Sequence, residues 1–242
     1  VYPVHCALPS GSAVPRGILK QHPEWALRNA RGEAIGYLSP FVPEAREWIA
    51  RVSHELVAKY QPDGLLLDYL RFPSEAVQVD GVPVSKDAAD RKTAQARKEA
   101  ALTELARLIS TTTRVAKPGL QIALYSWGPH VTTNHSVAQN WPLWIQRGYV
   151  DNVNVSGYCF TNNYGARYRE TFSRRLRDGV ALNRSVGSPA QITFALGVKT
   201  SHGQIQRADE VADYLKLAQA EGAQGVAVFT WGHLQPFREE VR

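Results

Sequence analysis

The sequence contains no methionine, only two cysteines and no long apolar run. No stretch approaches the roughly 20 apolar residues that a membrane-spanning helix needs, so we expect no membrane span. A secretion signal is also missing, but the lack of Met even at position 1 favours a processed or trimmed chain. The missing signal therefore does not by itself indicate a cytoplasmic protein.

The two cysteines, Cys6 and Cys159, each lie within an apolar run that is typical of a strand. Buried free thiols are the expected state of such residues, although a disulfide between the two stays open. The cysteine count consequently says little about the redox compartment.

Common cofactor motifs are absent as well. The sequence has no glycine-rich phosphate loop, no HExxH motif and no CxxC motif. His5, His130 and His233 could in principle converge on a metal with Asp68, but widely separated histidines are a weak pattern. We therefore predict no metal and no cofactor, and keep a metal-assisted barrel hydrolase as an alternative.

Basic residues exceed acidic ones, 28 to 22, which gives a net charge of +6 and a pI near 9.4. Much of the excess lies in residues 86–117 and 167–184, where solvated outer faces of helices explain it. The remainder leaves room for an anionic partner such as an acidic polysaccharide. A nucleic-acid site would interleave basic and aromatic residues on one surface. Here the aromatic residues stand at strand ends, so no nucleic-acid partner is predicted.

Residues 60–73, YQPDGLLLDYLRFP, are the most informative stretch. A Pro-Asp-Gly turn leads into three leucines, which predicts a strand over residues 65–70 that is buried on both faces, as in a parallel sheet. The strand carries a carboxylate, Asp68, near its C-terminal end, where α/β folds keep their chemistry. The alternative is an Asp that caps a helix or pairs with Arg71, but Pro73 argues against a helix directly after it.

Strands and helices alternate along the chain. Strands are predicted to start near residues 1, 65, 120, 150, 191 and 225, and helices at 43–60, 86–113, 141–148, 164–177 and 207–221. This βα pattern indicates an α/β fold with a parallel sheet. It contains six strand-helix units, whereas a full (β/α)₈ TIM-type barrel has eight. Without repeats or linkers, residues 1–242 are expected to form a single domain, with a small hairpin insertion at 76–84 that turns at Asp-Gly.

Polar and aromatic side chains gather at the predicted C-terminal ends of the strands, which converge on one pocket in a barrel. The candidate substrate-binding residues are His5, Tyr69, Tyr125, Trp127, His130, Asn154, Tyr158 and Trp231. Aromatic plates suit the apolar faces of sugar rings, and polar groups suit their hydroxyls. Core packing explains any single aromatic residue, but four at four different strand ends, Tyr125, Trp127, Tyr158 and Trp231, favour a carbohydrate site.

The segment DGLLLDYLRFP resembles the DG-x-x-x-D-x-x-R-[FY]-P signature of the glycoside hydrolase-like family 10 proteins. HPEW at 22–25, YLSP at 37–40 and WPLWIQRGYVD at 141–151 resemble further elements of that family. The resemblance implies a (β/α)₈ barrel, Asp68 as the leading catalytic carboxylate and an extracellular or periplasmic location. It also makes residues 1–8 the third barrel strand, so that the first two βα units either lie in a part of the protein outside these 242 residues or are missing from an incomplete or permuted barrel.

The predicted function is therefore a glycoside hydrolase that cleaves O-glycosidic bonds in a polysaccharide or oligosaccharide. Asp68 would be the general acid/base or nucleophile, and Arg71 would orient it and hold it ionised. Most glycosidases use two carboxylates, and no second one stands at a strand end here, since Asp151 begins its strand. A partner could come from the loop residues Glu24, Glu33, Glu75 and Asp80, from the absent strands or from the substrate. A catalytically inactive carbohydrate-binding barrel is the alternative, and the sequence does not indicate the oligomeric state.

Overall fold

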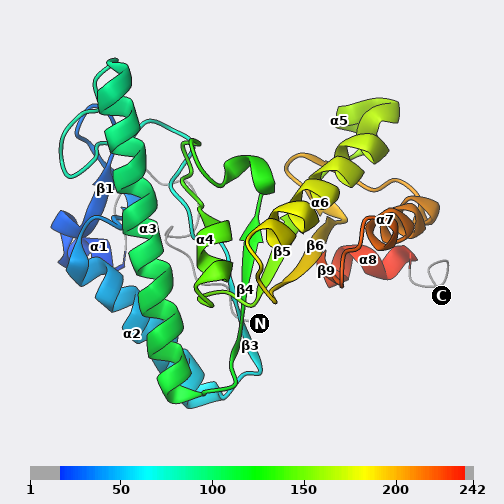
Figure 1. The fold of residues 1–242 in the computed structure, drawn as a ribbon, viewed down its shortest axis with the longest axis horizontal. Helices are drawn as coiled ribbons and strands as arrows, with labels where there is room; N and C mark the ends of the chain where they lie inside the picture. The colour runs from blue at the N-terminus through cyan, green and yellow to red at the C-terminus, as the bar shows by residue number, and fades with distance from the viewer. Residues whose placement is uncertain (1–16, 238–242) are drawn as a thin grey trace. The chain divides into compact units, whose positions relative to one another are not determined.

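The computed structural model describes residues 17–237, so the predicted first strand, with His5 and Cys6, lies outside the described residues. The described chain forms two compact units (Figure 1). The first contains residues 17–124 and 130–150, and the second contains residues 125–129 and 151–237. The single-domain organisation stays a prediction.

The first unit carries a small antiparallel pair, a parallel pair and two long helices. Its elements are α1 (Ile18–Gln21), the 3₁₀ turn η1 (Pro23–Trp25), β1 (Ala26–Arg28), β2 (Ala34–Leu38), α2 (Pro43–Tyr60), β3 (Gly64–Leu67), α3 (Ala88–Ala116), β4 (Gln121–Ser126), η2 (Pro129–Val131) and α4 (Trp141–Gln146). Strands β1 and β2 are antiparallel, and β3 and β4 are parallel. The last two residues of β4 and the first of η2 belong to the second unit.

Helices α2 and α3 pack side by side (Figure 1). Pro43 starts α2 at a position where its missing N–H costs nothing, as the sequence predicts. Helix α3 starts after Asp87, whose carboxylate accepts the backbone N–H groups of Ala89 at 2.7 Å and Asp90 at 3.2 Å. Proline therefore marks the start of α2, and the Asp87 cap marks the start of α3.

Strand β3 differs in two ways from its predicted form. Leu65 and Leu67 are 1% exposed, but Leu66 is half-exposed, so the prediction of burial on both faces is wrong. The strand ends at Leu67, because the backbone of Tyr69 is left-handed, with φ of 57°. Asp68 continues the alternation of the strand and thus follows Leu66 onto the half-exposed face.

The 76–84 segment contains a two-residue turn at Asp80 and Gly81. Val79 and Val82 exchange backbone hydrogen bonds of 2.9 and 3.0 Å, and both turn residues have positive φ, 49° and 81°. Such a turn favours Asp-Gly. Arg97 of α3 holds it through a bond of 2.6 Å from its Nε to the Asp80 carboxylate.

The second unit is built on a parallel sheet. Its elements are β5 (Asn152–Ser156), α5 (Thr161–Tyr164), η3 (Gly165–Arg167), α6 (Tyr168–Ser185), β6 (Gln191–Gly197), β7 (Lys199–Thr200), β8 (Gly203–Gln204), α7 (Ala208–Ala220), β9 (Val226–Phe229), α8 (Trp231–Leu234) and η4 (Gln235–Phe237). β6 pairs in parallel with β5 on one side and β9 on the other. Helix α6 packs on β5 and β6 and lies beside α7.

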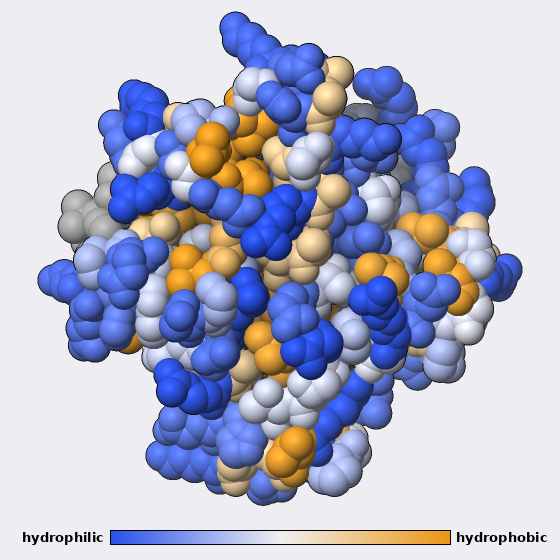
Figure 2. Space-filling view, turned by 60° about the vertical axis from the view of Figure 1, so that its left-hand side comes forward, coloured by the Kyte–Doolittle hydropathy of each residue, from blue (hydrophilic) through white to orange (hydrophobic). Residues whose placement is uncertain are grey.

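Parallel strands joined by helices make the chain a partial (β/α) barrel, as the predicted strand-helix alternation indicates. Hydrophilic residues cover most of the face seen in Figure 2, in keeping with the 21% of charged residues. Cys159 is the buried free thiol that the sequence predicts. Within residues 17–237, none of the helices is both long enough and apolar enough to cross a membrane.

Candidate active site

Asp68 opens a short loop after β3. It is half-exposed, and its Oδ1 accepts the backbone N–H of Tyr69 at 2.8 Å. The guanidinium of Arg71 lies 4.8 Å from the centre of the Tyr69 ring, and its Nη1 donates to the Phe72 carbonyl at 3.1 Å. The Arg71 side chain thus contacts the residues on both sides of it in the loop, Tyr69 and Phe72. Its charge-assisted contact with Asp68 stays a prediction.

The segment that follows His130 is hydrogen-bonded to residues 68–72, which we call the Asp68 loop. The Phe72 N–H donates to the Val137 carbonyl at 3.0 Å, and Nε2 of Gln139 donates to the Leu70 carbonyl at 3.2 Å. His130 itself is exposed, and its ring meets that of His135 edge-on at 6.1 Å. Two segments with predicted site residues, far apart in the sequence, therefore form one hydrogen-bonded structure in the first unit.

Lys98 of α3 is a buried charged residue beside these loops, with 8% of its surface exposed. Its ammonium group lies 4.8 Å from the centre of the Phe72 ring and donates to the Ser136 carbonyl. Burial lowers the pKa of Lys98 to about 8, against a smaller opposing effect of Glu99. Burial, with a contribution from Lys98, also lowers the pKa of His135.

This burial makes fold stability depend on pH on the alkaline side. The unfolded lysine, with its ordinary pKa of 10.5, binds more protons than the folded one between about pH 8 and that value. The free energy of unfolding should therefore rise with pH across this window, by on the order of 3 kcal/mol. This rise should be missing from Lys98→Met, which has no ammonium group at this position. Urea unfolding of both proteins at about pH 7 and about pH 10 measures the effect. A difference that does not change with pH would contradict it.

In the second unit, aromatic side chains cluster around Tyr158. The ring of Tyr125 lies 5.8 Å away, and those of Phe160, His202 and Phe229 lie 6.4 Å away. Tyr125 and Tyr158 are half-buried and His202 is exposed, while Phe229 is 51% exposed. The structure thus joins two predicted aromatic residues and adds His202 and Phe229, which the sequence analysis did not single out.

The remaining predicted residues of the second unit are placed differently. Trp231 begins α8 and is 63% exposed, whereas Trp127 is half-buried in the loop after β4. Asn154 is only 7% exposed, and its amide contacts Asn152 at 3.0 Å and the Thr193 hydroxyl at 2.7 Å. The Asn154 amide therefore takes part in a network within the sheet, and its contact with a sugar stays a prediction.

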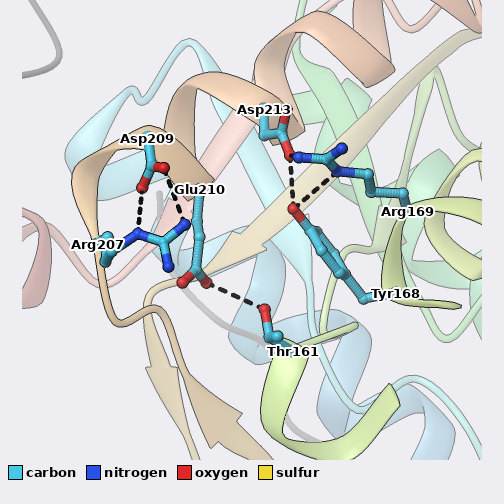
Figure 3. Close-up of polar contacts among 7 residues, drawn as sticks. All are labelled: Thr161, Tyr168, Arg169, Arg207, Asp209, Glu210 and Asp213. Atoms are coloured by element: carbon cyan, nitrogen blue, oxygen red, sulfur yellow. Dashed lines mark hydrogen bonds and ion pairs between the residues drawn. The ribbon is translucent and has the colours of Figure 1, made fainter. Parts of the chain in front are cut away.

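The segment after Tyr158 is bonded to α7 at two points. The Tyr214 hydroxyl donates to the Cys159 carbonyl, and the Thr161 hydroxyl donates to the buried carboxylate of Glu210 at 3.5 Å (Figure 3). The sequence analysis missed Glu210, because the helical pattern of α7 singles out apolar residues only.

Polar contacts tie helices α6 and α7 together. The hydroxyl of Tyr168 donates to Asp213 at 2.5 Å, and Arg169 contacts both groups (Figure 3). Arg207 and Asp209 pair at the start of α7 through two bonds of 2.9 Å. The contacts of Tyr168 and Arg169 with Asp213 therefore join α6 to α7, whereas the Arg207–Asp209 pair lies within the first turn of α7.

Three of the four candidate partner carboxylates have local contacts. Glu24 lies 3.1 Å from His22, Glu33 accepts from Asn29 at 2.7 Å, and Asp80 binds Arg97. Glu75 is exposed. Across residues 17–237, no group of three or more His, Cys, Asp or Glu side chains is arranged to hold a metal ion.

A family model, glycosyl hydrolase-like 10, matches residues 11–180, which is well over half of the chain. The chain belongs to the glycosyl hydrolase-like 10 family. This membership supports a carbohydrate-active function and confirms the resemblance found in the sequence. Curated protein sequences give no match.

Solved structures support the fold of this family member. The PgaB (BpsB) glycoside hydrolase domain from Bordetella bronchiseptica superposes with a TM-score of 0.65 at 15% identity, over 96% of this chain and 65% of that one. An α-L-fucosidase from Paenibacillus thiaminolyticus gives 0.58 at 15% identity, over 88% of this chain and 32% of that one. The α-galactosidase AgaA from Geobacillus stearothermophilus gives a TM-score of 0.51 at 12% identity, over 99% of this chain and 30% of that one. The chain thus spans less than two thirds of these structures.

Proposed function

We propose that the protein is a glycoside hydrolase that cleaves O-glycosidic bonds in a polysaccharide, with Asp68 as its main catalytic carboxylate. One observation carries the proposal: Asp68 stands half-exposed just beyond a parallel strand, in a member of a glycosyl hydrolase-like family. Acids at the C-terminal ends of such strands are where barrel enzymes place their chemistry.

In the proposed reaction, the bond between the anomeric carbon and the leaving oxygen breaks, the leaving oxygen takes up a proton, and the anomeric carbon gains the hydroxyl group of a water molecule. Asp68 serves as the general acid/base or as the nucleophile. The second role falls to another carboxylate or to a 2-acetamido group of the substrate. Tyr125 and Tyr158 supply apolar plates for sugar rings, and His130 hydrogen-bonds hydroxyl groups. In line with the family resemblance, we place this activity outside the cytoplasm.

The proposal is tested by release of new reducing ends from neutral, acidic and amino-sugar polysaccharides. We expect the chain to release them from at least one class, and the activity to survive a metal chelator. Binding seen by calorimetry without new reducing ends after long incubation would instead make the protein a carbohydrate-binding barrel. Activity that the chelator removes would favour the metal-assisted hydrolase.

A further inference from the structure

The Asp68 loop is anchored by residues that the proposed chemistry does not use. Gln139, which is 1% exposed, donates to the Leu70 carbonyl, two residues beyond Asp68. Lys98 places its ammonium group over the ring of Phe72, four residues beyond Asp68. Leu70 and Phe72 are each 1% exposed, so both anchor points are fixed within the core.

A strap formed by residues 134–139 connects these anchors to α3. Gln95 donates to the His135 carbonyl at 2.9 Å, Lys98 donates to the Ser136 carbonyl, and Glu99 accepts the Asn134 N–H at 3.2 Å. Lys98 and Glu99 lie three and four residues after Gln95, and residues with this spacing share one face of a helix. One face of α3 is therefore hydrogen-bonded to three successive residues of the strap.

The backbone of the strap supports a role in positioning. Asn134 and Ala138 both have left-handed backbones, with φ of 56° and 53°. Asn adopts this conformation readily, but Ala keeps it only where the surroundings over-determine it, at a cost of about 1–3 kcal/mol. Ala138 is fully buried between two residues that bond to the Asp68 loop, Val137 and Gln139. The strap is therefore a rigid element rather than a loose connection.

We propose that Lys98 and Gln139 are positioning residues, which hold the Asp68 carboxylate in its reactive place through the backbone of the Asp68 loop. This inference rests on the proposed function. A catalytic group displaced by about 1 Å can lose about 10²-fold in rate, while sugar binding elsewhere in the site is unaffected. Loss of either anchor should consequently act on kcat rather than on KM.

The test compares Lys98→Met and Gln139→Leu with the wild-type chain on a polysaccharide from which the wild-type chain releases reducing ends. We expect kcat to fall by about 10–100-fold and KM to stay within about twofold. Amide hydrogen exchange should also show weaker protection at Phe72, whose N–H bonds to the strap. Lys98→Gln replaces Lys98→Met if the latter does not fold.

Thr103→Val is the matched control. Thr103 is a buried residue of the same helix, and its hydroxyl accepts the Trp144 indole N–H at 2.9 Å, apart from the strap. We expect it to lower stability by about 1 kcal/mol and leave kcat unchanged. Unchanged kcat in Lys98→Met and Gln139→Leu would overturn the positioning role. So would a loss of kcat in Thr103→Val as large as the loss in those two variants. A wild-type chain without hydrolysis would overturn the proposed function itself, so the two failures are distinguishable.

Discussion

Asp68→Asn is expected to lower glycan hydrolysis by about 10²–10⁴-fold while the fold and sugar binding remain. The substitution removes the ionisable group but keeps an oxygen at the same position. That oxygen can still accept the Tyr69 N–H, the bond that shapes the start of the loop. Initial rates of reducing-end release, together with calorimetric affinity for the same glycan, measure the two effects separately.

Asp63→Asn provides the control for this substitution. Asp63 precedes the same strand, β3, at its opposite end, is fully exposed and pairs with Lys117 at 3.2 Å. Barrel enzymes place stability rather than chemistry at that end of their strands. We expect full activity for Asp63→Asn, and an equal loss in both variants would refute a special role for Asp68.

Gly197→Ala is expected to weaken glycan binding about tenfold, through displacement of the Tyr158 ring. An added Cβ would lie 2.5 and 2.7 Å from two ring carbons of Tyr158 and 2.9 Å from Cγ2 of Thr200. Non-bonded carbon atoms do not approach so closely, so we expect the Tyr158 ring to move away from Tyr125 and Phe229. Overpacking of this kind also costs about 1–3 kcal/mol of stability.

Calorimetry with a bound glycan and urea unfolding measure these two consequences. Gly232→Ala is the control, because a Cβ at Gly232, in the same unit, meets nothing within 4 Å. Unchanged affinity in Gly197→Ala, with its destabilisation confirmed, would mean that Tyr158 does not contact the sugar.

The sequence predicts helices best where end signals and periodicity agree. Helix α2 runs from Pro43 to Tyr60 as predicted, because proline marks its first turn and apolar residues recur at helical spacing. Helix α6 is less well predicted: it begins at Tyr168 rather than near residue 164 and continues to Ser185. The short elements α5 and η3 occupy the predicted start, and the helix extends beyond its predicted end near residue 177.

Site residues are harder to predict when they depend on contacts distant in the sequence. The position of Asp68 could be predicted because strand, turn and carboxylate are adjacent in the chain. His202 could not, because it lies in the hairpin of two-residue strands β7 and β8, too short to show a period. Lys98 looks like a solvent-facing lysine in the sequence, and only the fold places it over Phe72.

Hydrolysis in water labelled with a heavy oxygen isotope is the most direct test of Asp68 as the catalytic carboxylate of a glycosidase. Mass spectrometry of the products shows where the water oxygen ends. We expect one heavy oxygen at each new reducing end that the wild-type chain creates, and almost no labelled product from Asp68→Asn. Cleavage without label, or labelled product at equal rates from both proteins, would contradict this assignment.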